Sequence, residues 1–196
     1  MLSGKSLILA SGSPRRRELI SSFGIPFQVV VPDVDEEVAI ENPELLVRHL
    51  AEKKAEAVAK SWPDHVVLAA DTTVAVRSQG QFRILGKPRD EADAEAMLDI
   101  LQGRTHLVAT GFCIVCQAVG IKEVESAVTA VKFRAISPGE IEAYVKSGEP
   151  MDKAGAYAAQ GKGAALIQSV EGSYTNVVGL PLAEVYSTFV RLGLLR

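Results

Sequence analysis

Cysteine is scarce in this 196-residue chain, and its two copies are placed unlike a metal site. Cys113 and Cys116 lie in GFCIVCQ, where apolar residues alternate and no further Cys or His lies nearby. Such a pair is typical of buried thiols on the two faces of a strand rather than of a redox or zinc motif. So few cysteines indicate a reducing compartment, and we expect a cytoplasmic protein.

Long apolar runs and a basic surplus are also missing. No segment approaches the roughly 20 apolar residues that cross a bilayer, and the first apolar run, 7–10, soon meets three arginines, unlike a secretory signal. The net charge of -3 argues against a nucleic-acid groove. We therefore expect neither a membrane nor a nucleic-acid partner. With 47% hydrophobic residues, the chain can bury one core, and we expect a single domain over 1–196, large enough to be divided by a cleft.

The apolar pattern predicts strands and helices in mixed order, which indicates an α/β protein. Strands are expected at 6–10, 27–31, 66–76, 107–115 and 124–133, with another after residue 155. Helices are expected at 14–23, 43–60, 90–101, 138–147 and 181–192. The strands near 107–133 follow one another directly, which favours a mixed sheet over a purely parallel one.

The loop SGSPRR at 11–16 stands where the first strand passes into a helix. Ser13 suits the N-cap and Pro14 the first helical position. Free backbone N–H groups, two hydroxyls and adjacent arginines favour anion binding there, although an ordinary capped helix with solvated arginines has the same pattern. No GxxxxGK[ST] motif occurs in the chain, so phosphate binding would need a design other than the P-loop.

Lys54 and Asp71 carry charge into otherwise apolar patterns. Helical spacing places Lys54 on the apolar stripe of the 43–60 helix, where a buried ammonium needs an anionic partner unless its stem reaches water. Asp71 closes the apolar run 66–70, and a carboxylate at a strand end in an α/β sheet either caps a loop or acts on a ligand. The acidic loop after residue 31 is either simply solvated or joins Asp71 around a hard cation. Its candidate ligands are Asp33, Asp35, Glu36 and Glu37.

Two further loops add polar groups. Lys87 lies in the rigid turn GKPR just before a helix, and DKAGAYAAQG at 152–161 is polar and rich in glycine. Each alone is ordinary turn chemistry. Together, five separated loops supply the cations, carboxylates and backbone donors that a metal-bound polyphosphate requires.

These segments resemble the Maf family of nucleotide pyrophosphatases, which are related to inosine triphosphate pyrophosphatases. The resemblance runs nearly end to end through LASGSPRRRELI, AADTTVAV, LGKPRD, SGEPMDKAGAYAAQG and NVVGLPL, in family order. It implies an elongated mixed β-sheet flanked by helices, two lobes with a central cleft, and a homodimer. It also implies hydrolysis of a nucleoside triphosphate to the monophosphate and pyrophosphate with a divalent cation, Mg²⁺ or Mn²⁺.

The resemblance also assigns roles to residues. Asp71 takes the catalytic acid/base position, and Glu36, Lys54 and Lys87 take the remaining polar catalytic positions of the cleft. Asp71 and Glu36 would hold the metal. The implied substrate-binding residues are Ser11, Arg15, Arg16, Thr72 and Gln160.

The stretch DKAGAYAAQG resembles the family branch that acts on dTTP and UTP. Its specificity positions correspond to Arg15, Thr72 and Gln160. The carboxamide of Gln160 could pair with N3–H and O4 of uracil or thymine, but a flipped amide would also meet cytosine, so another contact must help exclude that base. Two alternatives stay open: a nucleotide-binding regulator of division or septum formation that hydrolyses slowly or incidentally, and a pyrophosphatase with relaxed or modified-base preference.

Overall fold

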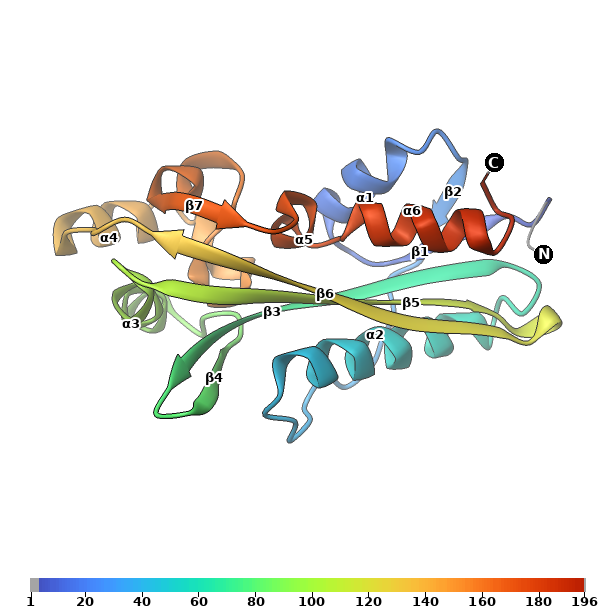
Figure 1. The fold of residues 1–196 in the computed structure, drawn as a ribbon, viewed down its shortest axis with the longest axis horizontal. Coiled ribbons are helices and arrows are strands. Elements are labelled where there is room, and N and C mark those ends of the chain that lie inside the picture. The colour runs from blue at the N-terminus through green and yellow to red at the C-terminus, as the bar shows by residue number, and fades with distance from the viewer. Residues whose placement is uncertain (1–3, 196) are drawn as a thin grey trace.

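The computed structural model describes residues 4–195 and is built on one seven-stranded sheet (Figure 1). The strands are β1 (Leu7–Ala10), β2 (Phe27–Val29), β3 (Val66–Ser78), β4 (Gln81–Leu85), β5 (Thr105–Cys116), β6 (Ile121–Phe133) and β7 (Ile167–Glu171). Three of them, β3, β5 and β6, are long and run through most of the molecule, which gives it an elongated shape.

Helices cover the sheet on both sides and at one end (Figure 1). They are α1 (Pro14–Ser21), α2 (Pro43–Ala59), α3 (Glu91–Leu101), α4 (Pro138–Val145), α5 (Tyr174–Val178) and α6 (Leu182–Arg191). Short 3₁₀ segments lie in the connections between these helices and strands: η1 (Gln117–Val119), η2 (Glu149–Asp152), η3 (Ala154–Ala156) and η4 (Gly161–Leu166). None of the helices within residues 4–195 is long and apolar enough to cross a membrane.

The sheet is mixed, as the sequence predicts. Its order is β2-β1-β3-β5-β6-β7, with β4 paired to β3 outside that path. β1 is parallel to both β2 and β3, and the remaining pairs are antiparallel. The parallel strands lie at one end, and the antiparallel β3, β5 and β6 extend from there to the other.

The molecule has two lobes, with two apolar clusters in the first lobe and one in the second. In the first lobe, α2 packs on one face of β1, β3 and β5, while α1 and α6 pack on the other face. Alternate residues of β3, such as Leu68 and Ala69, serve opposite clusters, as the period of a strand requires. In the second lobe, α3, α4 and the 3₁₀ segments η2, η3 and η4 pack on the far ends of the same long strands. The expected elongated α/β fold with two lobes is confirmed.

Local sequence signals account for the helix starts. Ser13 caps α1 by accepting a hydrogen bond from Arg16 N, with Pro14 at the first helical position. Ser137 and Glu140 form a complete capping box at α4. Cys113 and Cys116 are buried in clusters on opposite faces of the sheet, so that prediction is also confirmed.

Several elements differ from the sequence predictions. The strand β2 ends at Val29 rather than residue 31, and β4 and α5 were not expected at all. β4 is a short strand that gains its order by pairing with β3 in a hairpin, and α5 is only five residues long. The placing of Asp71 at a strand end is wrong, whereas the expected continuation of the strand to residue 76 is confirmed: β3 runs without interruption to Ser78, because β5 pairs with it across Asp71.

Candidate active site

One edge of β3 is open in the middle of the sheet. On that edge, pairing with β1 ends at Ala10↔Ala69 and pairing with β4 begins at Val74↔Leu85. The side chains of Asp71 and Thr72 lie between these limits and point to opposite faces of the strand. Both nevertheless line one cavity of about 870 Å³, because no neighbouring strand separates the two faces here. The chain therefore places its polar groups at a gap in the sheet.

Asp71 and Lys54 form a buried ion pair, in which Lys54 Nζ donates to Asp71 Oδ1 at 2.6 Å. The two residues are 8% and 7% exposed. Glu36, from the connection before α2, meets the same ammonium through Oε2 at 2.9 Å and is half exposed. Two carboxylates therefore converge on one cation at the cavity wall. A buried Lys54 was expected to need an anionic partner, and it has two, Asp71 and Glu36.

Helix α2 lies unusually close to the sheet beside this ion pair. Gly111 of β5 is the direct register partner of Asp71. A Cβ at Gly111 would lie 2.4 Å from Val47 O of α2, so the helix backbone occupies the space that any other residue would need. This close approach brings the side chain of Lys54, two turns further along α2, onto Asp71.

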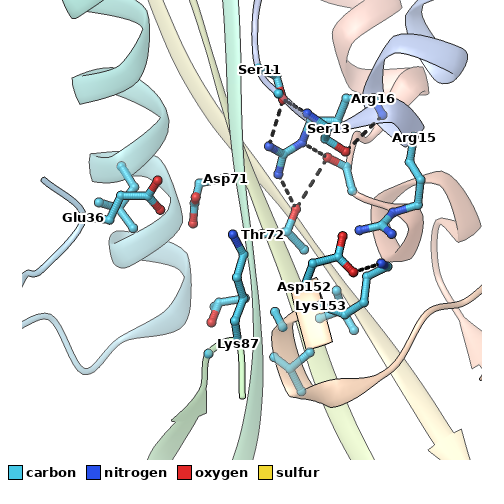
Figure 2. Close-up of a pocket in the computed structure, with 18 of the residues that line it drawn as sticks. Ser11, Ser13, Arg15, Arg16, Glu36, Asp71, Thr72, Lys87, Asp152 and Lys153 are labelled. Atoms are coloured by element: carbon cyan, nitrogen blue, oxygen red, sulfur yellow. Dashed lines mark hydrogen bonds and ion pairs between the residues drawn. The ribbon is translucent and has the colours of Figure 1, made fainter. Parts of the chain in front are cut away.

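The opposite wall comes from the loop before α1 and is organised around Arg16 (Figure 2). Its guanidinium donates to Gly179 O at 2.8 Å, to Thr72 Oγ1 at 2.9 Å and to Ser11 Oγ at 3.4 Å. Burial lowers the pKa of Arg16, and the charge of Asp71 opposes that shift. Thr72 Oγ1 is also within 3.0 Å of Thr110 Oγ1. Arg16 is thus a fixed positive charge that ties α1 to β3.

The remaining cations surround the open part of the cavity. Arg15 and Lys87 extend toward its centre, and Lys87 is exposed (Figure 2). Lys153 pairs with Asp152 close to Arg15. Partial burial by itself raises the pKa of Asp152, but the hydrogen bond and then the charge of Lys153 lower it, and the pKa lies below its ordinary value. Asp152 and Lys153 were not assigned to the site from the sequence, although DKAGAY was noted as a polar loop.

Eight of the nine sequence-predicted site residues line this cavity. They are Ser11, Arg15, Arg16, Glu36, Lys54, Asp71, Thr72 and Lys87. The ninth, Gln160, is half-buried directly after Ala159, which does line it, but Gln160 is not among the described lining residues. The sequence signal places Gln160 in the right loop, and its predicted contact with a base stays a prediction.

The carboxylates of the site are too few to hold a hard divalent cation without further ligands from substrate phosphates or water. Within residues 4–195 there is no group of three or more His, Cys, Asp and Glu side chains placed to hold a metal. Asp71 and Glu36 alone meet at one point, through their shared contact with Lys54. Mg²⁺ is commonly bound by one or two carboxylates together with substrate phosphates and water, so this pair fits that mode and not an all-protein cage.

Cations from separate elements therefore converge on one cavity beside a buried carboxylate. Clustered arginine and lysine side chains with a capped helix N-terminus are suited to phosphate groups. An apolar part of the same cavity, lined by residues that include Val177 and Val178, is suited to a less polar portion of a ligand. Fold and site together define an α/β protein with a cleft suited to a polyanion.

Comparison with known proteins narrows that class, and the chain belongs to the Maf family: the family model described as Maf-like protein matches residues 6–192. The chain is 52% identical over 189 residues to a dTTP/UTP pyrophosphatase of Myxococcus xanthus (strain DK1622), and the match covers 96% of this chain and 93% of the relative. It is 49% identical over 190 residues to a dTTP/UTP pyrophosphatase of Symbiobacterium thermophilum, with coverage of 96% and 95%. The resemblance that the sequence motifs indicated is confirmed.

A solved structure supports the fold. The Ham1 protein of Staphylococcus aureus superimposes with a TM-score of 0.53 at 14% identity, covering 96% of this chain and 100% of that protein. At so low an identity the likeness shows the shared α/β architecture alone.

Proposed function

We propose that this protein hydrolyses dTTP and UTP to the nucleoside monophosphate and pyrophosphate. The observation that carries the proposal is the buried Asp71–Lys54 pair at the open edge of β3, facing the arginines of the α1 loop across one cavity. The names of the Myxococcus and Symbiobacterium relatives, at about half identity over nearly the whole chain, supply the substrate class.

The residues suggest a division of labour in the reaction. Arg15, Lys87 and Lys54 neutralise the triphosphate, whose negative charge otherwise repels a nucleophile. Asp71 accepts the proton of the water that attacks the α-phosphorus. The hydrogen bond from Lys54 engages only Oδ1 of Asp71, so the second carboxylate oxygen can face that water. Pyrophosphate then leaves with its charge balanced by the surrounding cations.

We further propose that Asp71 and Glu36 would hold a divalent cation, Mg²⁺ or Mn²⁺, together with the substrate. When bound, it supplies additional positive charge against the phosphate oxygens. Lys54, which bridges the two carboxylates in the described structure, compensates their charge before substrate arrives.

A cytoplasmic location and a homodimer complete the proposal. The scarcity of cysteine supports the location, and the family resemblance supports the homodimer.

Base selection is proposed to come from the 157–163 loop and from Thr72. Gln160 follows the cavity wall formed by Tyr157, Ala158 and Ala159. A change of the Gln160 side-chain rotamer on substrate binding would bring its carboxamide toward a uracil or thymine edge. Because Gln160 does not line the cavity here, the fixed wall beside it must contribute to selectivity.

The direct test measures pyrophosphate release from dTTP, UTP, CTP, ATP and GTP, each with Mg²⁺, with Mn²⁺ and with a chelator. We expect release from dTTP and UTP that depends on the metal. Comparable rates for all bases would replace the proposal with a relaxed pyrophosphatase. Tight nucleotide binding without turnover would instead favour the regulator.

Asp71→Asn tests the proton acceptor. We expect kcat for UTP to fall by about 100- to 10,000-fold, the usual contribution of a general base, while circular dichroism stays that of the wild type. Asp99→Asn makes the same change at an exposed position of α3 and should keep full activity. Near-normal turnover by Asp71→Asn would refute the role.

A further inference from the structure

Besides the ion pair and the loop before α1, the cavity has a third wall, a loop whose shape is not fixed by a side-chain cap of its own. Residues 157–159 line the cavity, and the chain continues through Gln160 into the 3₁₀ segment η4. No side chain of η4 caps its start, and Gly161 adopts a φ of +74°. The shape of this wall therefore depends on contacts from outside the loop.

Glu149, at the start of the 3₁₀ segment η2, supplies those contacts. Its carboxylate accepts hydrogen bonds from Gly163 N at 2.8 Å, Lys162 N at 3.0 Å and the Tyr144 hydroxyl at 2.9 Å. The Tyr144 oxygen in turn accepts from Ala158 N at 3.2 Å. One carboxylate thus holds the far end of the loop directly, and through Tyr144 it also holds the near end.

The backbone of the loop packs tightly around this hydrogen-bond network. A Cβ at Gly163 would lie 2.5 Å from the Tyr144 hydroxyl and 2.4 Å from Ala158 O, and a Cβ at Gly161 would lie 2.6 Å from Glu149 Oε2. Glycines at both positions allow the backbone to close directly around the carboxylate and the phenol. The network is therefore built into the loop and is not a chance surface contact.

The charge on Glu149 is stable in this setting. Partial burial by itself raises the pKa of Glu149, but hydrogen bonds from Gly163 N, Lys162 N and the Tyr144 hydroxyl outweigh it, and the pKa lies below its ordinary value. An ionised carboxylate accepts hydrogen bonds at both oxygens, here from Gly163 N and Tyr144 at Oε1 and from Lys162 N at Oε2. A carboxamide accepts at one oxygen only, and its NH₂ group would place a donor against the remaining N–H or O–H donor.

We propose that Glu149 is a positioning residue that fixes the 157–163 loop as the base-selecting wall of the substrate cavity. This inference rests on the proposed function. The charged groups assigned to the phosphates lie on other elements, whereas the lining residues of the loop, Tyr157, Ala158 and Ala159, are uncharged and stand near the apolar Val177 and Val178. Loosening the loop should therefore weaken recognition of the base and spare the chemical step.

The test compares Glu149→Gln and Tyr144→Phe with the wild-type protein in steady-state pyrophosphate release from UTP and CTP. The first variant removes the charged acceptor, and the second removes only the hydroxyl that links Glu149 to Ala158 N. For each we expect KM for UTP to rise about tenfold, the equivalent of losing one hydrogen bond to a charged group, with kcat within about twofold. The ratio of kcat/KM for UTP over CTP should fall.

Glu142→Gln is the matched control, since this exposed glutamate of α4 pairs only with Lys146 on the surface. It should leave KM, kcat and selectivity unchanged. Because the two test variants act on one network, the double variant should raise KM by less than the product of the single effects.

Three outcomes would overturn the inference. Unchanged KM and selectivity in both variants would show that the loop keeps its shape without the network. A fall in kcat with KM and selectivity unchanged would show that Glu149 stabilises the fold and does not position the loop for base recognition. Wild-type protein that releases no pyrophosphate from any nucleotide would overturn the proposed function first, and this inference with it.

Discussion

At the scale of single residues, the site depends on a lysine buried where lysine is rarely found. The ammonium of Lys54 is compensated by Asp71 and half-exposed Glu36 within hydrogen-bond distance. Removing one member of a buried pair leaves the other charge without compensation, which is more costly than losing the pair as a whole. The arrangement therefore couples the folding of α2 to the chemistry of β3.

Lys54→Met tests this coupling. It should lower the free energy of unfolding by about 3 kcal/mol, because it leaves the Asp71 carboxylate buried without its cation. Urea denaturation followed by circular dichroism measures the change. In the double variant Lys54→Met/Asp71→Asn, which buries no charge at this point, much of the lost stability should return. Equal instability of the single and double variants would contradict the account.

The two adjacent arginines show how one motif divides into two roles. Arg16 is held by Gly179 O, Thr72 and Ser11, so it fixes the shape of the wall. Arg15 extends into the cavity and is available to a ligand (Figure 2). The sequence places both in an anion-binding loop, but only the partners of each side chain distinguish a structural cation from one available to substrate.

At the scale of elements, the close packing of α2 on β5 determines where the catalytic groups meet. The helix begins at an Asn42 cap and buries a stripe that includes Val47, Leu50 and Lys54. Gly111 lets its backbone approach the sheet, directly beside the register partner Asp71. A single glycine thereby sets the distance between the helix and the strand that share the ion pair.

Gly111→Ala should push α2 away from the sheet. We expect a loss of about 1–3 kcal/mol in the free energy of unfolding from overpacking, together with lower activity, because Lys54 moves with the helix. Thermal denaturation and pyrophosphate release measure the two effects. Gly139→Ala is the control: a Cβ there meets nothing within 4 Å, and alanine is the better helix former in α4. Equal effects at the two glycines would contradict the close-packing argument.

At the scale of the whole molecule, the cavity lies at the junction of the two lobes. The long strands continue through both lobes, and the gap between β1 and β4 exposes one edge of β3 between them. In the second lobe, His106 is 1% exposed, packs edge-on against Phe133 and shares a 2.8 Å hydrogen bond with Tyr157 of the cavity wall. Burial of this imidazole links global stability to pH.

Burial lowers the pKa of His106 to about 4 from 6.5. The unfolded chain therefore binds a proton at this residue below about pH 6.5 that the folded chain does not bind until about pH 4. Stability from this group is complete above the unfolded pKa and is lost as pH falls through that interval.

His106→Gln should flatten the dependence of unfolding free energy on pH between 6.5 and 4, by up to about 1.4 kcal/mol per pH unit. Urea denaturation across that interval measures the slope. His49→Gln, at an exposed position of α2, is the matched control for loss of an imidazole. An equal change of slope in both variants would contradict the assignment to His106.

Much of the molecule could be predicted from local sequence. Helical period and caps located α2, α3 and α4 to within about a residue at most ends, and apolar runs, with alternation in β6, located the long strands. The same patterns marked Lys54 and Asp71, because a charge in an apolar stripe is unusual whatever surrounds it. Ordered motifs then identified the family, and with it most of the charged residues that line the cavity.

Other features exist only through contacts between distant segments. β4 is ordered by its partner strand, and Asp71 lies within a continuous strand because β5 pairs across it while β1 stops short. The loop that follows Tyr157 takes its shape from Glu149 and Tyr144. Sequence alone determined the kinds of groups present and the local form of each element. Tertiary structure decided which groups meet, because pairing at strand edges and close packing at glycines depend on residues far apart in the chain.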